Sequence, residues 1–139
     1  MAASGAGLFT MPAMAGWNFA DAWEVVAETI PDAPALLHGD REVAWADLDR
    51  RADGVAAAIL AAGVGAGSSV AQYLTNRPEY IESVFAAFKL GLAPVNTNYR
   101  YVDDELVYLW DNADAAVVVF EGRFTDRIEG LLDRVPGVR

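Results

Sequence analysis

Two short stretches of this sequence gather side chains that could hold a polar ligand. They are residues 75–77 and residues 96–100, and each combines amides and hydroxyls with one arginine. Amides and hydroxyls can hydrogen-bond a ligand, while a guanidinium offers charge and paired donors to a phosphate or a carboxylate. The same residue types cap helices and form turns, so we favour local structural roles for the amides and hydroxyls and solvated arginines. The sequence leaves a ligand contact open for Asn76, Arg77, Asn98 and Arg100.

Other motifs that could carry chemistry fail on their context. The glycines of residues 63–67 follow a helical pattern and precede a strand pattern, whereas a dinucleotide-binding loop needs the strand first. They therefore predict a helix end, and they weaken an interpretation as an NAD-dependent dehydrogenase. His38 lies in a predicted turn without a Ser or Cys partner. The acids of residues 103–105 are typical of the first turn of a helix rather than of a metal cluster.

Composition narrows the classes of function further. The 139 residues include no cysteine and a single histidine, which excludes disulfide frameworks, iron–sulfur clusters and Cys-ligated zinc. The net charge of −10 argues against binding to nucleic acid or to an anionic membrane surface, because both rely on clustered cations. Hydrophobic residues make up 54% of the chain, which excludes intrinsic disorder. From the residues alone we assign no catalytic, cofactor-binding or metal-binding residue.

Hydrophobic periodicity predicts alternating helices and strands that would position these stretches. The predicted helices cover residues 19–30, 47–62, 78–89, 103–112 and 125–134. The predicted strands cover residues 70–74, 93–95 and 115–120, after a hairpin formed by residues 35–37 and 43–45. Asn18 is the expected cap of the first helix, and Pro94 favours an edge position for its strand. The uninterrupted apolar run at residues 115–120 is typical of a strand that is covered on both faces.

This order predicts an α/β fold with a mostly parallel sheet, helices on both faces and a preceding short β-hairpin. The loops after parallel strands emerge at one edge of the sheet, so residues 75–77 and 96–100 would lie near each other. Residues 1–16 are small and apolar and are expected to form a loose leader, without the basic start of a secretory signal. The uncharged run at residues 54–76 is broken by glycines and polar residues, so we predict no transmembrane segment.

Three segments together resemble the adenylate-forming superfamily of acyl- and aryl-CoA synthetases. Residues 43–52 (VAWADLDRRA) are similar to its strand-to-helix entry, and residues 76–80 (NRPEY) to its Asn-x-x-Glu-aromatic helix start. Residues 88–100 (FKLGLAPVNTNYR) resemble its Lys-x-Gly-x-x-Pro-Val-Asn-x-x-x-Arg segment. The likeness runs from about residue 17 to residue 139, which implies that residues 17–139 are the N-terminal portion of an AMP-binding domain. It is most similar to fatty-acid or medium-chain acyl-CoA ligases.

The resemblance implies a cytoplasmic parent enzyme that activates a carboxylic acid, such as a fatty acid, with ATP and Mg²⁺ and then transfers it to CoA. That chemistry needs a phosphate-binding loop, a metal ion and a lysine. The family's catalytic residues match no position in this sequence, and the single lysine, Lys89, stands in another context. We therefore expect the 139-residue polypeptide alone to be inactive, to bind none of these cofactors and to be marginally stable. The alternative is a stand-alone, non-catalytic, flavodoxin-like α/β binding module.

Overall fold

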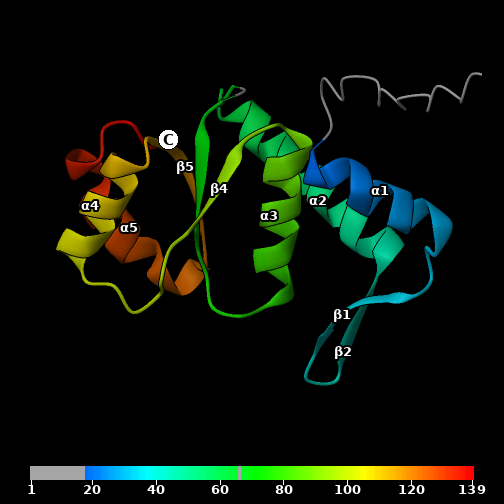
Figure 1. The fold of residues 1–139 in the computed structure, drawn as a ribbon. Coiled ribbons are helices and arrows are strands. Elements are labelled where there is room, and N and C mark those ends of the chain that lie inside the picture. The colour runs from blue at the N-terminus through cyan, green and yellow to red at the C-terminus, as the bar shows by residue number, and fades with distance from the viewer. Residues whose placement is uncertain (1–17, 66) are drawn as a thin grey trace, which may run out of the picture.

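The computed structural model of the chain describes residues 18–65 and 67–139, so the expected leader at residues 1–16 lies outside the described residues. Five α-helices and five β-strands alternate along this part of the chain (Figure 1). The helices are α1 (Phe19–Thr29), α2 (Trp45–Ala61), α3 (Pro78–Lys89), α4 (Asp103–Asn112) and α5 (Thr125–Leu131). The strands are β1 (Pro34–His38), β2 (Arg41–Ala44), β3 (Ser69–Tyr73), β4 (Ala93–Asn96) and β5 (Ala115–Phe120).

The predicted elements are all present, with differences at a few boundaries. Asn18 caps α1 as expected, since its side chain accepts a hydrogen bond from the Ala20 amide. Trp45 begins α2 instead of ending the hairpin, and its indole packs against that of Trp23 at 6.4 Å. Gly63 ends α2 with a φ of 76°, which confirms that the glycine-rich stretch is a helix end. The last predicted helix tightens into a 3₁₀ turn after α5, at Leu132–Arg134.

The sheet that organises the fold has three parallel strands in the order β4-β3-β5. Gln72 of β3 pairs with Asn96 of β4 and with Val119 of β5, so the three strands end close together. β4 is an edge strand, as Pro94 predicts. The hairpin β1-β2 is antiparallel and forms a separate two-stranded sheet. The predicted fold class, a mostly parallel α/β sheet preceded by a hairpin, is confirmed.

Helices cover both faces of this sheet and create two apolar cores. Figure 1 shows α2 and α3 on one side of the sheet and α4 and α5 on the other. Side chains alternate along β3, because Val70 belongs to the core under α2 and α3 while Tyr73 belongs to the core with Trp110 of α4. β5 alternates in the same way through Val117 and Val118. The strand predicted to be covered on both faces thus packs into both cores. No helix in the described part of the chain is long and apolar enough to cross a membrane.

The single lysine of the chain joins the three helices on one side of the sheet. The Lys89 ammonium lies 2.9 Å from Glu24 of α1 and 2.7 Å from both Asp49 and Asp53 of α2. Its side chain is 11% exposed, and the ammonium also lies 4.8 Å from the ring centroid of Phe85. Burial disfavours the charged form, but the hydrogen bonds to the three carboxylates outweigh it and raise the pKa of Lys89. The lysine is therefore a structural tie between α1, α2 and α3.

Replacement of Lys89 by methionine should destabilise the chain, because it keeps the aliphatic packing but leaves three carboxylates facing one another. We expect the free energy of unfolding to fall by about 2 kcal/mol, less than for a fully buried pair, because the carboxylates are partly exposed. Chemical denaturation of Lys89→Met and wild type measures this loss. Arg50→Met is the matched control, since it breaks one exposed pair with Asp47 and should cost under about 0.5 kcal/mol. Equal losses in both variants would contradict the structural role of Lys89.

The outer edge of β5 presents an open row of backbone groups. On this side the Arg139 amide donates to the Ala116 carbonyl at 2.9 Å, and no strand in the described residues pairs with it. A cavity of about 490 Å³ runs beside this edge, between Val117–Phe120 of β5 and the Arg51–Ile59 part of α2. An apolar strand with a free edge is a template for pairing with another chain.

We expect the purified 139-residue chain to self-associate through this edge as its concentration rises. Light scattering coupled to size-exclusion chromatography measures the effect. A lysine in place of Val119, which lines the cavity, should shift the distribution towards monomer because an edge charge opposes strand pairing. Circular dichroism reports whether the variant keeps its fold. A wild-type monomer with a sharp, reversible melt at all concentrations would contradict this expectation and the expected marginal stability.

Candidate functional site

The loops that follow the three parallel strands meet at the carboxyl edge of the sheet. The loop after β3 is joined to the loop after β5 by two hydrogen bonds to the Glu121 carboxylate, from the Thr75 hydroxyl at 2.9 Å and from the Arg77 guanidinium at 2.7 Å. The loop after β4 is tied to β3 because the Thr97 amide donates to the Gln72 carbonyl at 3.1 Å. In open α/β sheets this edge is where ligands bind. The structure brings residues 75–77 and 96–100 to the same edge, as the sequence predicts.

Arg77 is the centre of an ion-pair network, which corrects our expectation of an arginine that is only solvated, although 38% of its side chain remains exposed. Its guanidinium donates to Glu79 and to Glu121, each at 2.7 Å, and Glu79 also accepts a hydrogen bond from Arg41 of β2 at 3.0 Å. The hydrogen bond from Arg77 lowers the pKa of Glu79 to about 2, and the bond from Arg41 adds to this. Burial raises the pKa of Glu121, but the hydrogen bonds from Arg77 and Thr75 lower it more. The positive charge of Arg77 is thus neutralised by carboxylates of the protein itself.

The loop after β4 mixes local structural roles with one exposed charge. Thr97 is 1% exposed, and its hydroxyl accepts a hydrogen bond from the Trp110 indole at 3.1 Å. The Asn98 side chain accepts a hydrogen bond from the Arg100 amide at 3.0 Å, which confirms the turn-forming role expected of this asparagine. Arg100 is exposed, and its guanidinium lies 5.4 Å from the ring centroid of Tyr99.

Arg100 differs from every other cation of the chain. All ten Lys and Arg residues lie in the described part of the sequence. Eight of them form ion pairs with carboxylates, and the Arg139 guanidinium donates to the Gly63 carbonyl at 2.8 Å. Within the described residues, the Arg100 guanidinium alone donates to no protein acceptor. In a chain with a net charge of −10, Arg100 is therefore an exposed cation at the carboxyl edge of the sheet, with its donors free among the described residues.

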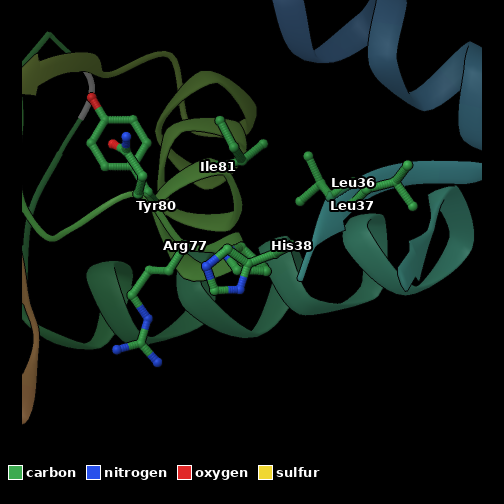
Figure 2. A pocket seen from close by; sticks show the side chains of 8 residues that line it. Leu36, Leu37, His38, Arg77, Tyr80 and Ile81 are labelled. Carbon is green, nitrogen blue, oxygen red and sulfur yellow. The ribbon is translucent and has the colours of Figure 1, made fainter. Parts of the chain in front are cut away.

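Two cavities open at this edge and share Asn76 and Tyr80. One has a volume of about 370 Å³ and is lined by neutral polar groups of the two loops, including Asn96, Thr97 and Asn98. The other, of about 340 Å³, lies between β1 and the start of α3 and is mainly apolar. Figure 2 shows this cavity, with Leu36, Leu37 and His38 of β1 on one side and Tyr80 and Ile81 of α3 on the other. Burial raises the pKa of Tyr80, so this phenol stays neutral between the two cavities.

Metal binding finds no support among the described residues. No group of three or more His, Asp or Glu side chains in residues 18–65 and 67–139 is arranged to hold a metal ion. The acids lie in the first turn of α4, as expected, and also have protein partners. Asp103 pairs with Arg127 and Asp104 with Arg134, while Glu105 accepts a hydrogen bond from the Val102 amide. His38 is exposed in the hairpin.

Our reasoning from the sequence missed the acidic partners of this edge. Glu121 directly follows β5 in the same way as Thr97 directly follows β4, so its place after β5 was the available signal. Glu79 looked like an ordinary first-turn acid. Nothing in the sequence indicates that Trp110 donates to Thr97, because that contact depends on how α4 folds back against β4.

The comparisons with known proteins agree with this geometry. The family model described as AMP-binding enzyme matches residues 23–137. The chain is 36% identical to a medium/long-chain-fatty-acid–CoA/3-oxocholest-4-en-26-oate–CoA ligase of Mycobacterium marinum, over 122 residues or 88% of its own length. The identity is also 36% over 122 residues with a 3-oxocholest-4-en-26-oate–CoA ligase of Rhodococcus rhodochrous. In each case the match covers 22% of the relative, so the chain spans about a fifth of the length of these curated relatives.

Solved structures show the same fold. An anthranilate CoA ligase in complex with anthranoyl-AMP superposes with a TM-score of 0.81 at 25% identity, over 92% of this chain and 25% of that one. A putative long-chain-fatty-acid CoA ligase from Rhodopseudomonas palustris gives a TM-score of 0.79 at 29% identity, over 88% of this chain and 31% of that one. The parallel sheet and its flanking helices are therefore the arrangement found in these ligases.

The Arg77–Glu79–Arg41 contacts predict a loss of stability in acid. The pKa of Glu79 is about 2 in the folded chain against an ordinary value of 4.5, so its contribution is complete above about pH 4.5 and is lost as the pH falls towards 2. After allowance for solvent screening, we expect about 1 kcal/mol from this carboxylate. Urea denaturation between pH 5 and pH 2.5 measures it. Glu79→Gln should flatten the pH dependence, whereas Asp32→Asn, at a carboxylate with no ion pair in the described structure, should leave it as in wild type. A profile unchanged by Glu79→Gln would contradict the assignment.

Proposed function

The chain belongs to the AMP-binding enzyme family, and from this premise we propose that it is the N-terminal part of an ATP-dependent acyl-CoA synthetase. The enzyme joins a carboxylic acid to ATP, which gives an acyl-adenylate and pyrophosphate. The thiol of CoA then attacks the acyl carbon, which gives a thioester and AMP. The observation that carries the proposal is the family match over residues 23–137, with relatives named as CoA ligases. The names of these relatives support a fatty acid or a similarly apolar acid as the substrate.

Within this function, we assign the carboxyl edge of the sheet to a phosphate-bearing cosubstrate. Both ATP and CoA carry phosphates, and Arg100 is the cation that the described residues leave unpaired at this edge. A guanidinium binds phosphate through paired, charge-assisted hydrogen bonds. Arg77 is not assigned this role, because Glu79 and Glu121 already accept hydrogen bonds from it and neutralise its charge.

We further propose that residues 1–139 alone do not catalyse the reaction. Among the described residues no group of three or more His, Asp or Glu side chains is arranged to hold a metal ion, and Lys89 is surrounded by three carboxylates. Mg²⁺, the loop that holds the phosphates and the catalytic lysine would then come from other parts of the enzyme. This proposal also places the activity in the cytoplasm, with ATP, CoA and a small carboxylic acid as partners and without nucleic acid.

A chimera tests the proposal. Residues 18–139 would replace the matching segment of the Rhodococcus rhodochrous relative, and acid-dependent pyrophosphate release and thioester formation would be measured. We expect the chimera to be active, and the 139-residue chain alone to show no acid-dependent ATP–pyrophosphate exchange.

In the chimera, Arg100→Ala should raise the KM for ATP or for CoA about tenfold with a smaller change in kcat, because one charge-assisted contact is lost. Arg50→Ala, which removes an exposed cation of α2 that pairs with Asp47, is the matched control.

Three outcomes would contradict the proposal. A folded but inactive chimera, together with tight nucleotide binding by the isolated chain, would favour the non-catalytic binding module. Exchange activity in the isolated chain would show that the reactive groups lie within these residues. Equal KM values in wild-type and Arg100→Ala chimeras would remove the assigned phosphate contact.

A further inference from the structure

The loop after β4 is held from inside the protein by a buried hydrogen bond that contacts no solvent. The Trp110 indole nitrogen donates to the Thr97 hydroxyl at 3.1 Å, and each residue is 1% exposed. An indole has one N–H group, which can only donate, and in the described structure Thr97 is the acceptor of that hydrogen bond. The bond joins α4, on one face of the sheet, to the residue that directly follows β4. It therefore fixes the point where the loop begins.

Two hydrogen bonds within the loop connect this fixed point to the backbone of Arg100. The Asn98 side chain accepts a hydrogen bond from the Arg100 amide at 3.0 Å, and the Asn98 carbonyl accepts one from the Tyr101 amide at 3.0 Å. These bonds close a tight turn that begins at the residue after Thr97. The Arg100 side chain has no protein acceptor among the described residues, so its position depends on the backbone of this turn and on the Tyr99 ring.

We infer that the Trp110–Thr97 hydrogen bond is a positioning device for the phosphate-binding Arg100, an inference that rests on the proposed function. Packing alone would be served by a valine at position 97, which has nearly the same shape as threonine. The hydroxyl and the indole nitrogen add a directional contact, and its loss would leave one buried donor unpaired. Thr97 and Trp110 are thus positioning residues that act through Arg100, and neither is expected to touch the reacting atoms.

The test uses Thr97→Val, which removes the hydroxyl while it keeps the shape, and Thr97→Ser, which keeps the hydroxyl. In the 139-residue chain, Thr97→Val should speed amide hydrogen exchange at residues 99–101 about tenfold, while exchange at β3 stays as in wild type. Thr97→Ser should restore slow exchange. Thr75→Val is the matched control, because it removes a hydroxyl from the neighbouring loop and should leave residues 99–101 unchanged.

Kinetics of the chimera then test whether Thr97 acts on cosubstrate binding through Arg100. Thr97→Val should raise the KM that Arg100→Ala raises, by about threefold to tenfold, with little change in kcat. In the Arg100→Ala background the same change should have no further effect on this KM. A KM increase of equal size in both backgrounds, or a lower melting temperature with unchanged KM and unchanged loop exchange, would overturn the inference.

These measurements separate the two proposals. If Arg100→Ala leaves every KM unchanged, the assigned phosphate contact fails, while hydrogen exchange still shows whether the buried bond orders the loop. If Arg100→Ala raises a KM but Thr97→Val changes neither exchange nor KM, the proposed function stands and the positioning role is wrong.

Discussion

The parallel pairing of β3 with a neighbour on each side is the constraint from which the rest of the structure follows. Because β4 and β5 both run in the direction of β3, all three strands end at one edge and all three following loops emerge there. Parallel strands need a crossover connection, and the right-handed crossovers through α3 and α4 place these two helices on opposite faces of the sheet. The two apolar cores and the loop cluster that we assign to ligand binding are consequences of this pairing.

Charge is distributed over this scaffold in a selective way. A chain with twice as many acids as bases pairs its cations internally, as Lys89 does between α1, α2 and α3 and as Arg77 does between Glu79 and Glu121. These pairs hold helices and loops in place and leave little positive potential for ligands. Arg100 differs from these cations, because no carboxylate among the described residues holds its side chain in place. The buried bond between Trp110 and Thr97 supplies the order that such a loop would otherwise lack.

Most of the fold could be predicted from the sequence, since it depends on local periodicity. The helix that starts at Pro78 and the apolar run of β5 follow directly from residue spacing, and the alternation of helices and strands dictates the parallel sheet. The site could be predicted only in part. The sequence locates Arg77 and Arg100 after two strands, but it does not indicate that one is ion-paired and the other is not. Their difference depends on Glu121, which is 44 positions from Arg77 in the chain and reaches it only after folding.

Parallel register in the three-stranded sheet is the claim on which both the fold and the edge site depend. Through-space NMR contacts between backbone protons of the isotope-labelled chain test it most directly. The structure requires contacts that pair Ser69 with Ala93 and Gln72 with Asn96, together with Gln72 and Val119 on the other side of β3. Contacts that place Ser69 opposite Asn96 and Gln72 opposite Ala93 would mean antiparallel strands. The loops would then leave opposite edges of the sheet, which would contradict a shared ligand edge and the position assigned to Arg100.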